Sequence, residues 1–203
     1  MSIDINSELK RMATEFEIPE KDVATNFRQA VRSMWSDGIF KKDFYEKNAI
    51  EVVNTNPRSM KRFPKVKKYK CAICENYFSA VDTELDHIVS ENTMTALDHA
   101  EDFIKTIFFT SPKNLQILCK DKRSKAKDSK GFVTHFGCHG IKTYLERYNV
   151  TFEKAKSEKY IINICKFPVK TLDFLRENGV ESIPKTKKAQ HELVRSIVEN
   201  ENG

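Results

Sequence analysis

The chain has no hydrophobic run long enough to cross a bilayer. A membrane-spanning helix needs roughly 20 consecutive apolar residues, and no segment of the 203 residues approaches that length. The start of the chain, MSIDINSELK, lacks the basic stretch followed by an apolar stretch that marks a secretory signal. We also find no internal repeat and no long low-complexity segment. These absences predict a cytoplasmic protein with no membrane partner.

Cysteine is sparse, with five residues in the chain. In a reducing cytoplasm such residues are more often metal ligands or buried thiols than disulfides. Cys71 and Cys74 form a C-x2-C pair, whose spacing lets two thiolates from one tight turn reach the same tetrahedral ion. Cys119 and Cys138 supply two further candidate ligands, and zinc is the preferred ion for four thiolates. Cys165 lies in the apolar stretch YIINICKF and is predicted to be a buried core thiol.

Positive charge exceeds negative charge by six and is gathered in runs. RSMKRFPKVKKYK at 58–70 contains no acid, and KDKRSKAKDSK at 120–130 and KTKK at 185–188 are further basic runs. One such run alone is often only a solvated face, but three runs favour a polyanionic partner. The predicted nucleic-acid contacts are Arg58, Lys61, Arg62, Lys65, Lys67, Lys68, Lys122, Arg123, Lys125 and Lys127.

Apolar periodicity and turn residues divide the chain into three predicted segments. Residues 1–66 are predicted to be helical and basic. From 67 to 148 two strand-like pieces, TELDHIV and NLQILC, are separated by a helical stretch around 94–109, and HGIKTYLERY is predicted to be a helix. Residues 149–203 are predicted to form helices again.

The first segment contains a helix with a clear apolar stripe. Pro19 suits the start of this helix, Asp22 could cap it, and Gly38 suits its end. The stripe, which assigns Trp35 to the core, consists of Val23, Phe27, Val31, Met34 and Trp35.

An acid and a histidine stand side by side in ELDHIVS. Asp86 offers an oxygen ligand for a divalent cation, and His87 can act as a base near neutral pH. His139 could supply a nitrogen ligand from the first turn of a helix, with Lys142 on the same face. These groups near a basic surface suit phosphodiester hydrolysis. Each also has a bland interpretation, as a surface pair, a helix cap or a solvated lysine.

The order of the motifs resembles that of the HNH endonuclease family. C-x2-C, (E)LDHI, NLQ-x-LC and CH-x2-KT follow one another. The chain looks most like the phage-encoded homing and nicking branch, which has a helical, basic N-terminal segment before the first C-x2-C. DFIKTIFF, between the two strands, also matches that branch. The resemblance covers roughly residues 25–148 and does not reach the tail.

The resemblance implies an α+β fold: a ββα-metal core with structural zinc, a helical N-terminal segment and a helical C-terminal extension. Accordingly 1–66 would be the N-terminal segment, 67–148 the nuclease core with a basic insertion at 120–137, and 149–203 the extension. If the gene belongs to a phage, the protein would work in the cytoplasm of a bacterial host.

The same resemblance implies a role for each motif residue. His87 would be the general base, and Asp86 and His139 would hold a catalytic Mg²⁺ or Mn²⁺. Asn114 matches an asparagine that holds the loop carrying the base, and Lys142 matches a lysine near the scissile phosphate. The structural zinc ligands would be Cys71, Cys74, Cys119 and Cys138.

Two features depart from the family pattern. Strict β alternation would send Asp86 and His87 to opposite faces of their strand. They can converge only if the strand ends or bulges there, as it does in the family that the chain resembles. The family commonly has LC-x2-CH, whereas eighteen residues, 120–137, separate the two cysteines here. We expect a flexible basic loop inserted into an intact zinc site, with His135 as a substitute ligand in the alternative case.

The sequence therefore predicts a metal-dependent DNA endonuclease. Its rival is a zinc-stapled, non-catalytic DNA-binding accessory or regulatory protein, which would not need Asp86, His87, Asn114 and His139 together. RNA hydrolysis uses the same chemistry and is not separated from DNA hydrolysis by the sequence. One active site would nick one strand, so cutting both strands would need a dimer or two successive events.

Overall fold

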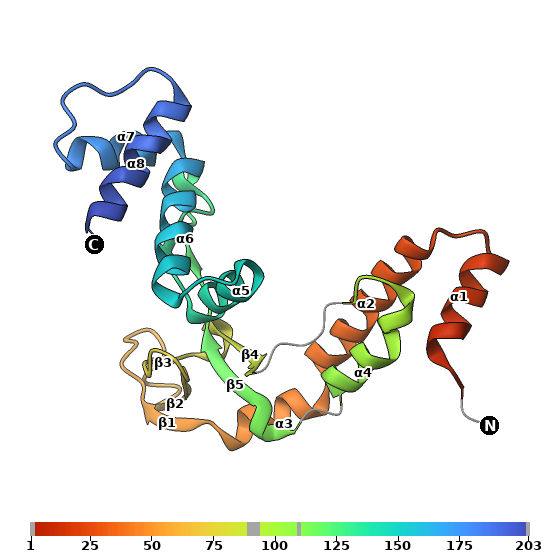
Figure 1. The fold of residues 1–203 in the computed structure, drawn as a ribbon. Coiled ribbons are helices and arrows are strands. Elements are labelled where there is room, and N and C mark those ends of the chain that lie inside the picture. Colours follow the sequence, from red (N-terminus) through yellow and green to blue (C-terminus); the bar gives the residue numbers. More distant parts are fainter. Residues whose placement is uncertain (1–2, 89–93, 109–110, 202–203) are drawn as a thin grey trace. The chain divides into compact units, whose positions relative to one another are not determined.

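The computed structural model describes residues 3–88, 94–108 and 111–201. These residues form a mixed α+β structure of helices and small sheets (Figure 1). They divide into two compact units, described one at a time below. Unit 1 comprises the described residues of Met1–Ala72, Asn76–Ala80 and Leu85–Ile117, and unit 2 those of Ile73–Glu75, Val81–Glu84 and Leu118–Gly203. The functional segments 1–66, 67–148 and 149–203 stay a prediction.

Unit 1 is built mainly on four helices. Asp4 caps the first by accepting hydrogen bonds from the backbone N–H groups of Asn6 and Ser7. The second follows Pro19 without a side-chain cap, so the predicted cap by Asp22 is wrong: this residue already lies within the first turn. The four helices are α1 (Ile5–Glu15), α2 (Glu20–Asp37), α3 (Ile39–Lys47) and α4 (Ala100–Phe108).

The apolar core of unit 1 lies where α1, α2 and α4 pack together. The predicted stripe on α2 is confirmed for Val31, which is buried, and for Trp35, which packs against the core. The assignment of Met34 to the stripe is wrong, because this side chain is 65% exposed. The stripe continues four residues on from Val31 to Trp35, and Met34 lies more than a quarter of a turn away. The buried cluster consists of Ala13, Ala24, Val31, Met94, Leu97, Ala100, Phe103 and Ile107.

A three-stranded antiparallel sheet follows the first three helices of unit 1. It contains β1 (Ile50–Val53), β2 (Lys65–Lys70) and β3 (Tyr77–Phe78), and Val52 lies opposite Val66. The prediction of helix throughout residues 1–66 is therefore wrong from Ile50 onward. The β-branched Ile50, Val52 and Val53 prefer the extended backbone, and β2 supplies the pairing partner.

The two strands predicted around the acid–histidine motif are confirmed. β4 (Thr83–His87) pairs with β5 (Leu115–Cys119) in a two-stranded sheet. Side chains along β4 alternate between buried and half-buried, so one face of the strand is covered. Leu85 of β4 packs with Ile117 of β5 and Tyr69 of β2 in a second apolar cluster.

Unit 2 is largely helical, as predicted for the tail. Asn149 ends the first of its helices with a left-handed backbone, and Gly179 follows the third in the same region of φ. A core of Ile161, Ile164, Leu175, Val194 and Val198 holds the last three helices together. The four helices are α5 (Cys138–Tyr148), α6 (Phe152–Lys166), α7 (Pro168–Glu177) and α8 (Lys187–Glu201). In the described part of the chain no helix has the length and apolar character to span a membrane.

The basic insertion at 120–137 is a packed hairpin, so the prediction of a flexible loop is wrong. β6 (Lys122–Arg123) pairs with β7 (Val133–His135). The buried Asn163 of α6 accepts a hydrogen bond from the N–H of Val133 at 2.9 Å and donates one to its carbonyl at 3.0 Å. The ring of Phe132 meets the ring of Phe167 at 5.6 Å between centroids. These partners lie about thirty residues further along the chain and give the insertion an anchor.

An ion pair between α6 and α8 makes the stability of unit 2 dependent on pH. Arg195 donates to both carboxylate oxygens of Glu158, at 2.6 and 2.9 Å. This hydrogen bonding holds the pKa of Glu158 below its ordinary value. An acid with a lowered pKa stabilises the fold above its unfolded-state pKa, and the contribution is lost as the pH falls through the lowered value.

We expect Glu158→Gln to lower the unfolding free energy at pH 7 by up to about 1 kcal/mol. The deficit should shrink toward pH 3, because acid removes the same charge from the parent protein. Thermal unfolding followed by circular dichroism at both pH values measures it. Glu192→Gln, at an exposed pair with Lys188, is the matched control. An equal deficit at both pH values would contradict the role of the ion pair.

Candidate functional site

Four cysteines lie together in the structure. The sulfur atoms of Cys71, Cys74, Cys119 and Cys138 are all within 4.8 Å of one another and form no disulfide. Cys74 Sγ and Cys119 Sγ are 3.9 Å apart. A tetrahedral ion with metal–sulfur bonds of about 2.3 Å would separate its ligands by about 3.8 Å. The cluster could therefore hold a metal ion, and the insertion leaves all four candidate ligands together.

Turn geometry and strand ends bring the cysteines to this point. Cys71 follows β2, and its N–H donates to the carbonyl of Asn76 at 2.9 Å across a tight turn. Glu75 in that turn has a left-handed φ of 59°. Cys119 is the last residue of β5, and Cys138 is the first residue of α5. The N–H of Cys138 donates to Cys119 Sγ at 3.2 Å, which is the kind of contact that stabilises a thiolate.

Histidine does not join this cluster. Among the described residues, the group of candidate metal ligands contains the four cysteines alone. The proposed substitute, His135, is exposed on β7. The alternative of an altered ligand set is therefore not needed.

Asp121 and Lys159 hold the start of α5, and sequence reasoning missed both roles. Asp121 Oδ1 accepts the N–H of Gly137, the residue that precedes α5, at 2.9 Å. Asp121 Oδ2 pairs with Lys159 Nζ of α6 at 3.2 Å, and both side chains are mostly buried. An anion at a helix N-terminus is favoured by the helix dipole. The position of Asp121, two residues after a ligand cysteine, was the signal available in the sequence.

Two glycines permit the close approach of this helix start. A Cβ atom on Gly137 would overlap the backbone of Lys120 and Asp121 and the carbonyl of Cys119. A Cβ atom on Gly140 would meet the end of the Lys159 side chain and the carboxylate of Asp121. The first overlap involves backbone that carries a candidate ligand, whereas the second involves side-chain atoms.

We expect Gly137→Ala to destabilise the fold by about 1–3 kcal/mol, a typical cost of overpacking. It should also weaken metal binding, because the added methyl group forces Cys119 away from Cys138. Thermal unfolding and competition with a chromogenic chelator measure the two effects. Gly140→Ala is the control and should cost less, since the lysine chain can move. Equal metal affinity in the parent and Gly137→Ala would contradict the account.

The cysteine cluster makes a second prediction, on metal content. We expect the purified chain to carry about one metal ion, and Cys74→Ser to lose metal and unfold at lower temperature, because binding at a structural site contributes folding free energy. Cys165→Ser changes a cysteine outside the cluster, so this variant should retain the metal ion and the parental unfolding temperature. Elemental analysis and calorimetry measure the outcome. The site would be contradicted if the metal-free parent protein unfolded cooperatively at the same temperature as the parent protein supplied with metal.

Asp86 and His87 occupy the end of β4 and differ in their surroundings. Asp86 is half-buried, and its Oδ2 accepts a hydrogen bond from Gln116 Nε2 at 3.1 Å. His87 is 7% exposed, and its ring lies 5.6 Å from the ring of Trp35. Burial thus alternates along β4 as its sequence predicts, with a half-buried acid followed by a buried imidazole at the end of the strand.

Asn114 is connected to the acid–histidine strand through its backbone. Its carbonyl accepts the N–H of Ile88, the residue after His87, at 2.7 Å. Its own N–H donates to the carbonyl of Ser111 at 2.8 Å in a short turn. The structure thus brings Asp86, His87 and Asn114 together within unit 1.

His139 and Lys142 lie on α5 of unit 2, one turn apart. His139 is half-buried. Lys142 is 8% exposed and pairs with Glu146 at 2.5 Å. The bland interpretation of Lys142 as a solvated lysine is therefore wrong. Burying a charged amine costs free energy unless it is paired, and Glu146 provides the partner of Lys142.

The predicted nucleic-acid contacts are nearly all accessible. Of the ten residues, nine are exposed and Lys68 is half-buried. Six belong to the β1–β2 hairpin of unit 1, and four belong to the inserted hairpin of unit 2. Lys65 pairs with Glu51 at 3.5 Å, on the neighbouring strand.

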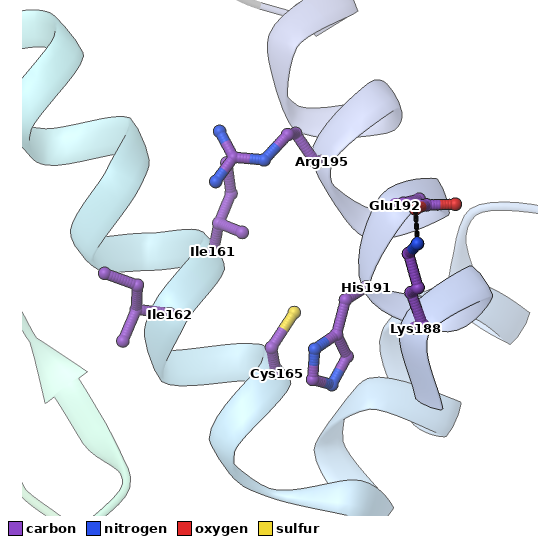
Figure 2. A pocket seen from close by; sticks show the side chains of 7 residues that line it. All are labelled: Ile161, Ile162, Cys165, Lys188, His191, Glu192 and Arg195. Atoms are coloured by element: carbon purple, nitrogen blue, oxygen red, sulfur yellow. Dashed lines mark ion pairs between the residues drawn. The ribbon is translucent and has the colours of Figure 1, made fainter. Parts of the chain in front are cut away.

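A cavity of about 510 Å³ lies in unit 2, lined by residues of α6 and α8 (Figure 2). Cys165 and His191 both line it. Cys165 was predicted to be a buried core thiol, and it is half-buried against the core. Burial raises the pKa of this thiol, so it stays protonated at neutral pH and is a poor nucleophile.

Comparisons with known proteins add no assignment. No protein-family model, curated protein or solved structure matches the chain significantly.

Proposed function

We propose that the chain is a metal-dependent DNA endonuclease of the HNH type, in which a structural zinc ion supports a ββα core. The observation that carries the proposal is the proximity of Asp86, His87 and Asn114 at the β4–β5 pair, where the N–H of Ile88 donates to the carbonyl of Asn114. The four-cysteine cluster supports it, because it ties the end of β5 to the first residue of α5. β4, β5 and α5 then follow in the chain order that the resemblance implies. The acid–histidine pair ends β4, and His139 lies in the first turn of α5.

Zinc is the ion best suited to the cluster. Four thiolates in tetrahedral reach of one point select zinc or an iron centre among the common metals, and closed sites with four protein ligands are structural. The N–H of Cys138 donates a hydrogen bond to Cys119, which stabilises the excess negative charge that four thiolates bring.

Asp86 and His139 would hold the catalytic Mg²⁺ or Mn²⁺. Asp86 supplies a partly accessible carboxylate, the ligand type that suits these ions, and His139 supplies a partly accessible imidazole. When bound, such a cation polarises the scissile phosphate and stabilises the leaving oxygen. Gln116 orients the carboxylate of Asp86 through its hydrogen bond, as outer partners of metal ligands commonly do.

His87 would take the proton from the attacking water. Its ring packs against Trp35, which restricts the rotation of the imidazole. The backbone bond from Ile88 to Asn114 fixes the strand immediately after the base. Lys142, held by Glu146 on α5, would stabilise negative charge on the phosphate. Holding a general base in one orientation lowers the entropic cost of aligning it with the attacking water.

The burial of His87 favours a second function, a zinc-stapled DNA-binding protein without turnover. A base that is 7% exposed must become accessible to water before it can act, whereas a core histidine needs no access. Such a protein would keep the cysteine cluster and the basic hairpins. The two proposals differ in whether phosphodiester bonds are cut.

Incubation with supercoiled plasmid tests the proposal directly. The endonuclease should convert supercoiled DNA to nicked or linear DNA with Mg²⁺ or Mn²⁺, and EDTA should stop it. A structured RNA in a parallel reaction separates the two substrate classes. Plasmid that is bound but stays intact with both cations would favour the non-catalytic function.

We expect His87→Ala to reduce the cleavage rate by about 10²–10⁴-fold, the usual contribution of a general base. Binding of duplex DNA in EDTA should be retained. Because the alanine also leaves a cavity beside Trp35, His87→Gln provides a variant that keeps most of the volume and should be equally inactive. His99→Ala, an exposed histidine of the same unit, is the control. Parental cleavage by a folded His87→Gln protein would overturn the assignment.

A further inference from the structure

The connection between β1 and β2, residues 54–64, is a structured tip (hereafter the hairpin tip). Asn54 is buried at its base. The side-chain amide of Asn54 donates to the carbonyl of Phe63 at 2.7 Å and to Ser59 Oγ at 3.0 Å. Its Oδ1 accepts the N–H of Asn56 at 3.0 Å. One buried side chain thus joins both arms of the tip.

Backbone hydrogen bonds complete the hairpin tip. The N–H of Asn54 donates to the carbonyl of Pro64 at 2.9 Å and closes the base. Met60 N–H donates to Asn56 and Phe63 N–H to Ser59, both at 2.8 Å. These bonds hold two successive turns in one conformation, so a partner would not have to order the segment on binding.

The hairpin tip presents apolar and cationic side chains together. Met60 is 46% and Phe63 52% exposed. Arg58, Lys61 and Arg62 are exposed beside them, and the guanidinium of Arg62 lies 5.2 Å from the centre of the Phe63 ring. No acidic residue occurs from Val52 to Cys74. The surface therefore fits a polyanion that also offers an apolar interior.

Base-paired DNA has this chemistry, with phosphates outside and stacked bases inside. Isolated exposed apolar residues need no explanation, but a preformed basic tip with two of them is a different case. Stacking platforms for single strands use aromatic rings, and one of the two residues here is a methionine. Phe and Met are among the residues that wedge between base steps from the minor groove and kink the duplex.

We propose that the hairpin tip is a wedge that inserts Met60 and Phe63 between base pairs of duplex DNA. Arg58, Lys61 and Arg62 hold the flanking phosphates. The inference rests on the DNA substrate of the proposed function, but it requires no cleavage. β2 leads from the hairpin tip to Cys71, so the wedge stands on a strand that ends at the cysteine cluster.

The test uses the full-length protein in EDTA and a short duplex with a fluorescent donor and acceptor at its ends. The parent should bring the ends together by a kink of at least about 20°. Met60→Ala/Phe63→Ala should lose the kink and bind the duplex roughly tenfold more weakly. Phe16→Ala, at a residue 68% exposed in the same unit, should match the parent. Melting temperature and metal content show that the variants are folded.

A charge variant separates the wedge from the phosphate contacts. Lys61→Gln/Arg62→Gln should flatten the slope of log affinity against log salt by about 1.8, from two phosphate contacts of about 0.9 each. The apolar variant should leave this slope unchanged.

A kink that persists in Met60→Ala/Phe63→Ala, or an equal loss in Phe16→Ala, would overturn the wedge. Tighter binding to a single strand than to the duplex would overturn it in favour of base stacking, and a parent that binds no duplex would overturn it as well. The outcome is independent of turnover: a kink lost in the apolar variant supports the wedge even if plasmid is never cut.

Discussion

The gathering of four cysteine sulfurs within 4.8 Å of one another constrains three parts of the chain that are far apart in sequence. The turn after β2, the end of β5 and the start of α5 must all reach one point. Other features serve this meeting: Gly137 leaves room for the backbone beside Cys119, and Asp121 satisfies the N–H of Gly137. A bound ion would add its binding free energy to the stability of this folded arrangement.

The same constraint explains how a basic insertion can be tolerated between two ligands. Residues 120–137 leave the cluster after Cys119 and return to it at Cys138, so both ends are fixed. Between them, Asn163 and Phe167 hold the inserted hairpin, and Lys159 holds Asp121. All three partners come from the C-terminal extension, which thereby acquires a structural role: it supports the insertion and the first turn of α5.

Local pattern predicted much of this arrangement, and long-range partners account for the rest. The C-x2-C spacing, the strand TELDH and the helix that starts at Cys138 are visible in the sequence because each depends on neighbouring residues. The bond between Asn163 and Val133 and the pair of Asp121 with Lys159 are not, because either partner alone is an ordinary polar residue. β1 was missed because a short segment rich in β-branched residues becomes a strand only when β2 is present. Met34 was assigned to the buried stripe of α2, which instead passes through the next residue, Trp35.

Zinc-edge X-ray absorption of the purified protein tests the central claim most directly, because it reports the atoms bound to the metal. The account predicts four sulfur neighbours at about 2.3 Å and no nitrogen or oxygen in the first shell. Cys138→His should replace one sulfur with one nitrogen at about 2.0–2.1 Å. A first shell of the parent that contains nitrogen, or fewer than four sulfurs, would contradict the account.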